Sequence, residues 1–217
     1  METVASDGNL VLRRRQDGNL ELRANGVFVM DTVETSTERE LAARALALHP
    51  APARVLVGGL GLGYTLAAVL ADRRVERCTV AEIEPALVSW LRDGIVAHGP
   101  ALLADDRVEV RVEDVAVVLR TGPPAAYDLV LLDVDNGPGY LVHEANAGLY
   151  AAPALTQARA ATAPGGMVVI WSSAEAPELG TAMRAVFGDV EELDYSVRIQ
   201  TRAERYWLYA ARVTSNP

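Results

Sequence analysis

The stretch "VLVGGLGLGYTL", residues 55–66, decides the fold class of this chain. It begins as an apolar run typical of a buried strand and continues as a glycine-rich loop, with Gly59, Gly61 and Gly63 at alternating positions. Glycine lets the chain turn sharply and lets a ligand approach the backbone, and a helix that follows such a turn offers free N–H groups. The stretch therefore predicts a strand, a ligand-contacting turn and a helix, although a tight turn without a ligand would need the same glycines. Tyr64 stands where a dinucleotide fingerprint has its third glycine, so a dinucleotide is a poorer candidate.

Strand and helix patterns alternate from this stretch onward. Strands are predicted at 54–58, 77–82, 107–112, 127–133 and 166–172, and helices at about 62–73, 85–97, 146–162 and 175–187, with a short turn near 114–120. Runs such as "YDLVLLDV" are apolar throughout, which is typical of parallel strands covered on both faces. The end, "EELDYSVRIQTRAERYWLYAARV", predicts an antiparallel hairpin. Together these patterns predict an α/β protein with a doubly wound, Rossmann-like, mostly parallel sheet.

The residues before this stretch predict a small N-terminal sheet. "DGNL" occurs at 7–10 and again at 17–20, and "NGVFVMD" follows. Asp-Gly and Asn-Gly pairs between short extended runs are strong hairpin signals. We therefore expect a β-meander domain over 1–34 and a catalytic domain over 35–217.

A helix is predicted to connect the two domains. In "TSTERELAARALAL", Thr35 with Glu38, or Thr37 with Glu40, has the spacing of a capping box. The helix is expected to end near His49, which precedes a proline.

Composition excludes several classes of function. The chain has 217 residues and a net charge of −9. This charge disfavours a nucleic-acid partner, because phosphate groups bind to basic surfaces. The chain has no apolar run of the roughly 20 residues that span a bilayer, and its first residues lack the order of a secretion signal, so neither a membrane nor secretion is expected. The lone Cys78 suits a cytoplasmic protein, and no Cys/His cluster has metal-ligand spacing, so no metal is expected.

Acidic residues end three consecutive predicted strands. Glu82 lies 23 residues after Gly59, at a position where a carboxylate can accept both hydroxyls of a ribose. Glu113 and Asp114 end the next strand, where Asp114 could receive an adenine amino group, and Asp133 ends the one after it. Because unpaired buried carboxylates are costly, these acids are predicted to face a ligand rather than the core.

The order of glycine loop, "EIE", "ED" and "LLDVDNGPG" resembles the spermidine synthase-like branch of the class I S-adenosylmethionine-dependent transferases. The N-terminal meander and "MDTVETSTERE" are similar to the entry segment of that family. The resemblance implies that the three loop glycines hold the methionine part of the cofactor, that Glu82 binds the ribose and that Asp114 binds the adenine. It places Ile83 and Glu113 in the cofactor site, and Asp133 at the position of the catalytic carboxylate. It also makes a homodimer the expected assembly.

Several residues depart from the family pattern, and these departures bear on whether the reaction is methyl transfer or aminopropyl transfer. Leu62 stands where the family's loop has an aspartate that holds the amino group of decarboxylated S-adenosylmethionine, and Thr35 or its neighbour stands where it has a glutamine. Arg44 falls near the place of a tyrosine, and a fixed cation there would repel a polyamine. We therefore predict methyl transfer from S-adenosylmethionine to a small-molecule acceptor. Aminopropyl transfer from the decarboxylated cofactor, and a cofactor-binding protein without catalysis, are the alternatives.

Candidates for catalysis and acceptor binding follow Asp133, the first choice for a general base. Asp135 could partly replace a family aspartate, and His143 could act as a base, although a single loop histidine is more often a surface or packing residue. Substrate-binding candidates are Tyr140 and Glu144 in the loop after Asp133, Arg44 for an acceptor that bears a carboxylate, and Trp171 at the border of the pocket. A solvated helix face for Arg44 and a packing role for Trp171 are the simpler alternatives.

Overall fold

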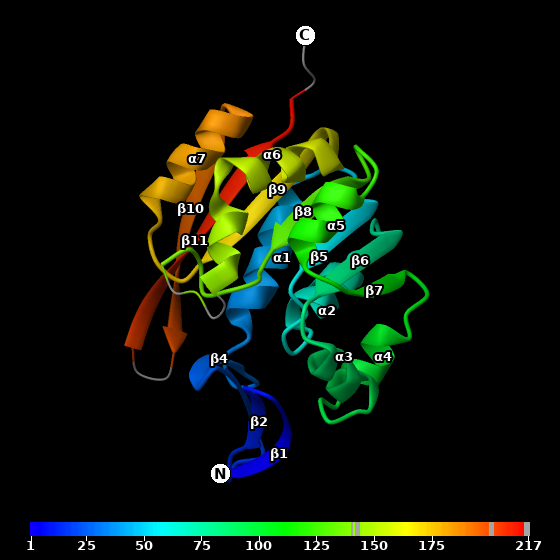
Figure 1. Ribbon diagram of the computed structural model, residues 1–217, viewed down its shortest axis with the longest axis vertical. Coiled ribbons are helices and arrows are strands. Elements are labelled where there is room, and N and C mark those ends of the chain that lie inside the picture. The colour runs from blue at the N-terminus through cyan, green and yellow to red at the C-terminus, as the bar shows by residue number, and fades with distance from the viewer. Residues whose placement is uncertain (140, 142–143, 200–201, 215–217) are drawn as a thin grey trace.

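The computed structural model describes residues 1–139, 141, 144–199 and 202–214, and it contains two sheets with helices on both faces of the larger one (Figure 1). The smaller sheet is an antiparallel meander in the order β1-β2-β3-β4. Its strands are β1 (Glu2–Asp7), β2 (Leu10–Arg14), β3 (Leu20–Ala24) and β4 (Val27–Asp31). Its three turns fall at the Asp-Gly and Asn-Gly pairs, so the predicted meander is confirmed.

The larger sheet has the strand order β10-β11-β9-β8-β5-β6-β7. Its parallel strands are β5 (Arg54–Gly58), β6 (Arg77–Glu82), β7 (Val108–Val112), β8 (Tyr127–Leu132) and β9 (Thr162–Ser172), and its antiparallel strands are β10 (Val190–Ile199) and β11 (Arg202–Arg212). The predicted doubly wound sheet with a terminal hairpin is confirmed. The chain proceeds from β5 outward to β7 and then returns to β8 on the other side of β5, so the order reverses between β5 and β8. Ligands of open α/β sheets bind beside the carboxyl ends of the strands at such a point.

Helices connect the strands and cover the sheet. They are α1 (Ser36–Leu48), α2 (Tyr64–Ala71), α3 (Pro85–Arg92), α4 (Gly99–Leu103), α5 (Val115–Thr121), the 3-10 helix η1 (Glu144–Tyr150), α6 (Ala152–Ala161) and α7 (Pro177–Phe187). Alternate residues of each central strand pack into different cores. Val55 and Val57 of β5 pack in one cluster with residues of α1, α2 and α3, whereas Leu56 packs with residues of α5, α6 and α7. This two-sided burial explains why the parallel strands are apolar throughout.

The meander shares a core with one face of the larger sheet. Leu12 and Leu22, both almost fully buried, belong to the same cluster as Val55 and the buried face of α1. The meander is therefore packed against the rest of the molecule, at the lower end in Figure 1. The division into domains at residue 34 stays a prediction.

Four local predictions are wrong. The helix predicted over 85–97 ends at Arg92, and the single helix predicted over 146–162 is divided into η1 and α6. The turn near 114–120 is the helix α5, whose first turn is capped by Asp114. Neither predicted capping box forms, since Thr35 is the N-cap of α1 but makes no side-chain capping bond.

Candidate functional site

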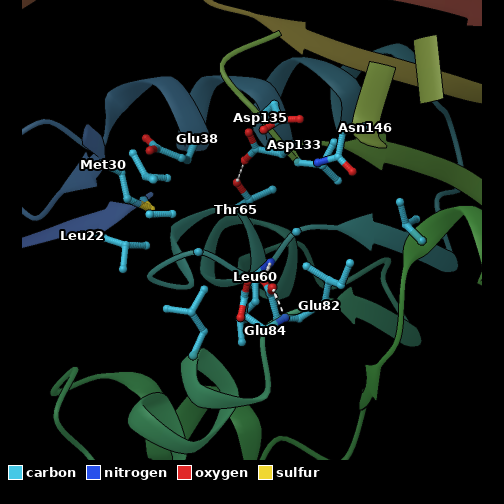
Figure 2. A pocket seen from close by; sticks show the side chains of 18 of the residues that line it. Leu22, Met30, Glu38, Leu60, Thr65, Glu82, Glu84, Asp133, Asp135 and Asn146 are labelled. Atoms are coloured by element: carbon cyan, nitrogen blue, oxygen red, sulfur yellow. Dashed lines mark hydrogen bonds between the residues drawn. The ribbon is translucent and has the colours of Figure 1, made fainter. Parts of the chain in front are cut away.

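A pocket of about 1030 Å³, counting the open space at its mouth, lies at the carboxyl ends of β5, β6 and β8. The meander and α1 complete its walls, so residues far apart in the sequence face one space (Figure 2). The predicted residues among its lining are Gly59, Gly61, Glu82, Ile83, Asp114, Asp133, Asp135 and Trp171.

The glycine loop forms the floor of the pocket. Gly59 has φ +94°, and a Cβ atom at this position would lie 2.2 Å from the carbonyl oxygen of Asp133. Only a residue without a side chain fits here, because both the backbone angle and the space exclude others. Gly61 also has positive φ, at +51°, and lines the pocket. Gly63 is the left-handed N-cap of α2 and is not among the lining residues.

Glu82 fixes the shape of this loop. Its side chain is 5% exposed at the end of β6, and its two oxygens accept hydrogen bonds from the N–H groups of Leu60 and Glu84, each at 2.8 Å. Burial raises the pKa of Glu82, and the hydrogen bonds from the backbone act in the opposite direction. The carboxylate therefore connects the turn after β5 to the turn after β6, on the side where both open to the pocket.

The remaining predicted cofactor residues have different positions. Ile83 lines the pocket with 49% of its surface exposed, so it offers an apolar contact to a ligand. Asp114 also lines the pocket, but one of its oxygens accepts the Ala116 N–H at 2.8 Å as the cap of α5. Glu113 is not among the lining residues, and its N–H donates to the carbonyl of Glu82.

A group of acidic side chains lies on the opposite side of the pocket from Glu82 (Figure 2). Asp133, at the end of β8, accepts a hydrogen bond of 2.8 Å from the hydroxyl of Thr65. Burial raises the pKa of Asp133 to about 6. Asp135 is 7% exposed and also lines the pocket. Because its pKa is about 6, the carboxylate of Asp133 can accept a proton near neutral pH, as a general base must.

Glu38 is a pocket residue that the sequence analysis assigned to a capping box. It projects from α1 into the same space, and the hydroxyl of Thr37 donates to its carboxylate at 2.5 Å. Burial, and then the negative charge of Asp133, raise the pKa of Glu38 to about 7. Other lining residues that sequence reasoning missed include Leu10, Leu22, Val29, Met30, Thr37, Thr65 and Asn146.

Two substrate-binding candidates have clear positions. Arg44 is not among the lining residues, because its guanidinium pairs with Glu40 at 3.0 Å and lies over the ring of Tyr195. Trp171 lines the pocket, is 9% exposed and stacks on Tyr206, with ring centroids 5.4 Å apart. Trp171 therefore has both the pocket position and the packing contact that were considered for it.

The other candidates from the loop after β8 are not placed. Tyr140 and His143 lie outside the described residues, as does the side chain of Glu144. Within the described residues, no group of three or more His, Cys, Asp or Glu could hold a metal ion, and no helix is long and apolar enough to cross a membrane.

Comparison with known proteins finds polyamine aminopropyltransferases and a spermidine synthase among the relatives of this chain. No family model matches the chain. The polyamine aminopropyltransferase of Halorhodospira halophila is 29% identical over 198 residues, which cover 86% of this chain and 68% of the relative. Spermidine synthase 1 of Pisum sativum is 30% identical over 65% of this chain and 43% of its own length. The polyamine aminopropyltransferase of Aeropyrum pernix is 29% identical over 50% of this chain and 37% of its own. The match thus spans well under two thirds of most of these relatives.

Solved structures agree on the fold. The spermidine synthase of Thermotoga maritima has a TM-score of 0.80 at 17% identity, covering 99% of this chain and 74% of that one. A spermidine synthase in complex with the transition-state analogue AdoDATO has a TM-score of 0.82 at 18% identity, covering 99% and 75%.

The fold and the pocket at its switch point define a protein of the class I S-adenosylmethionine-dependent methyltransferase-like fold. Within that class, the chain is similar in sequence to polyamine aminopropyltransferases and spermidine synthases, and it shares the fold of solved spermidine synthases. The resemblance read from the sequence is confirmed.

Proposed function

We propose that this protein transfers an alkyl group from an S-adenosyl sulfonium compound to a small amine, with aminopropyl transfer as the first candidate reaction. The observation that carries the proposal is a pocket with Glu82 on one side and the partly buried Asp133 on the other. The relatives, which are named for aminopropyl transfer, support the same reaction. Methyl transfer, the reaction predicted first, becomes the second candidate.

The residues of the pocket fit an adenosyl donor. The absence of a Cβ atom at Gly59 and Gly61 leaves their backbone open to the donor, and Glu82 keeps acceptor capacity for ribose hydroxyls beyond its two backbone bonds. Ile83 and Asp114 would contact the adenine of the donor. The bound donor supplies a carbon already activated by the sulfonium, so the protein has to align the attack and accept a proton.

The acidic side of the pocket fits a cationic acceptor. The carboxylate of Asp133 attracts an ammonium group and, once ionised, accepts the proton that the nitrogen must lose before it attacks. Arg44 was the reason to doubt a cationic acceptor. Its guanidinium pairs with Glu40 away from the pocket, so it does not oppose an amine there.

Methyl transfer remains the second candidate because of Leu62. This residue replaces an aspartate that the family resemblance assigns to the amino group of the decarboxylated donor, and its side chain is fully buried. It therefore offers that amino group no anionic partner.

A donor titration followed by a mass screen tests the proposal. We expect the protein to bind S-adenosylmethionine or its decarboxylated form, and to add one aminopropyl or one methyl group to a member of a pool of small amines. Glu82→Gln should weaken donor binding about tenfold or more, because a charge-assisted acceptor for ribose and backbone N–H groups is lost. Donor binding that is unchanged in this variant, or an amine pool left unmodified with both donors, would contradict the proposal.

The proposed base predicts a dependence on pH. Because burial raises the pKa of Asp133 to about 6, we expect kcat to rise as pH increases through 6 and to level off above it. The same carboxyl binds its proton more tightly in the folded than in the unfolded state. Its contribution to the free energy of unfolding should therefore be lost as pH rises from about 4 to 6. A pH–rate profile and denaturant unfolding across this range measure both effects, and a rate that falls with pH through 6 would rule out Asp133 as the base.

A further inference from the structure

We propose that Glu38 is a second acceptor-binding residue, whose carboxylate holds the protonated nitrogen of the amine together with Asp133. This inference rests on the proposed function and gives a binding role to a residue that the sequence analysis considered only for a capping box. Its basis is the arrangement of two carboxylates from different elements in one pocket, with no ion pair to a cation among the residues that the structure describes.

The two carboxylates come from elements that are far apart in the sequence. Glu38 is on the first turn of α1, and Asp133 follows β8, yet both side chains point into the same space beside Thr65 (Figure 2). Each has a hydroxyl donor of its own, Thr37 for Glu38 and Thr65 for Asp133. A hydroxyl orients a carboxylate but does not balance its charge.

The nearby arginines of α1 are directed elsewhere. Arg39 bonds to Thr35 at 3.2 Å and lies over the ring of Tyr64, and Arg44 pairs with Glu40. Within the described part of the chain, neither Glu38 nor Asp133 has an ion pair with an arginine or histidine.

Among the described residues, the other charged and titratable groups around Glu38 are anionic or neutral. Asp133 acts from β8, Glu34 from the loop before α1, Tyr64 from α2 and Tyr195 from β10. Two partly desolvated carboxylates that repel each other are unfavourable unless a cation joins them or a proton neutralises one. The alkylammonium of the acceptor is the cation that the proposed reaction supplies.

Binding of the amine should therefore depend on the ionisation of Glu38. The pKa of this carboxyl, raised to about 7, places its proton loss within the range of ordinary assays. As pH rises through 7, Glu38 becomes an anion while an alkyl amine is still protonated, so amine affinity should increase.

Glu38→Gln is the decisive variant, and Glu40→Gln is its matched control. Both make the same chemical change on α1, but Glu40 pairs with Arg44 outside the pocket. Binding is measured by calorimetry with 1,4-diaminobutane as the probe, in the presence of 5′-methylthioadenosine, and does not require turnover. We expect the probe to bind Glu38→Gln at least about tenfold more weakly at pH 8, with its pH dependence near 7 lost, and Glu40→Gln within about twofold of the native protein.

Thermal unfolding separates this role from a structural one. Replacing a partly buried anion by a neutral amide of the same shape should leave the midpoint at pH 8 unchanged or raise it. A lowered midpoint, or probe binding that equals the native level, would overturn the assignment of Glu38. If Glu38→Gln binds the probe as the native protein does and still transfers the alkyl group at the native rate, the proposed function stands without a role for Glu38. If the native protein does not bind the probe at all, the assignment is overturned together with the amine acceptor, while the donor titration with Glu82→Gln still tests the other half of the site.

Discussion

Asp133→Asn should lower kcat by about a thousandfold while leaving donor binding unchanged, because an amide cannot accept the proton that the acceptor nitrogen loses. The residue is suited to this role by its environment. It is held at the end of β8 by the Thr65 hydroxyl at 2.8 Å, and burial makes its conjugate acid weak enough to exchange protons near pH 6. Single-turnover rates with a saturating donor and amine, together with donor titrations, measure the two parts of the prediction.

The control lies on the same strand. Asp128 is near the start of β8, where its carboxylate binds the Arg54 guanidinium at 2.6 Å, and neither residue is among those that line the pocket. Asp128→Asn makes the same chemical change and should lower the unfolding midpoint without changing kcat. The stability of Asp133→Asn should be maintained, since the substitution removes a buried carboxylate. A residual rate within tenfold of the native rate would exclude Asp133 as the base.

The fold could be predicted because its signals are local and repeated. An apolar strand followed by a glycine turn and a helix specifies one unit of a doubly wound sheet, and the sequence contains several such units. Asp-Gly and Asn-Gly pairs similarly specified the meander. Helix boundaries were less accurate, because they depend on tertiary contacts as much as on propensity. Asp114, for example, caps a helix in a segment where a turn was expected.

The site could be predicted only where its residues follow strands. Glu82, Asp114 and Asp133 end consecutive parallel strands, and the topology brings such positions to one edge of the sheet. Glu38 gave a different signal, because a glutamate in the first turn of a helix is also what a capping box requires. Its pocket position depends on how α1 packs across β8 and on the placement of the meander. The hydrogen bond between Thr65 and Asp133 joins residues that are 68 positions apart, and no local sequence pattern predicts it.

Arg44 shows the limit of transferring a role by position. Alignment to a family motif located it where a substrate-contacting side chain was expected, and its charge then argued against an amine. In the folded chain, Glu40 lies one helical turn before it and binds its guanidinium, while the ring of Tyr195 from β10 covers it. An i,i+4 pair of this kind is visible in the sequence. The tyrosine contact is not.

Gly59→Ala should destabilise the protein by about 2–4 kcal/mol and abolish donor binding. Two costs combine at this residue. Its φ of +94° is strained for any residue with a side chain, and the added Cβ would lie 2.2 Å from the carbonyl oxygen of Asp133, which cannot move without shifting the end of β8. Because this contact joins the donor side of the pocket to the proposed base, relief of the clash would separate the two groups that the reaction needs together.

Gly18→Ala separates these two costs. Gly18 has a similar φ of +87° in a hairpin of the meander, but nothing lies within 4 Å of its added Cβ. We expect it to lose only about 1–2 kcal/mol from backbone strain and to keep full donor affinity. Chemical denaturation and donor titration are measured for both variants. The difference between their losses of unfolding free energy gives the cost of the contact between the added Cβ at residue 59 and the carbonyl oxygen of Asp133. Equal losses of stability in the two variants, or native donor affinity in Gly59→Ala, would show that the turn after β5 can move away from β8 without harm, and the proposed alignment of donor and base would lose its structural basis.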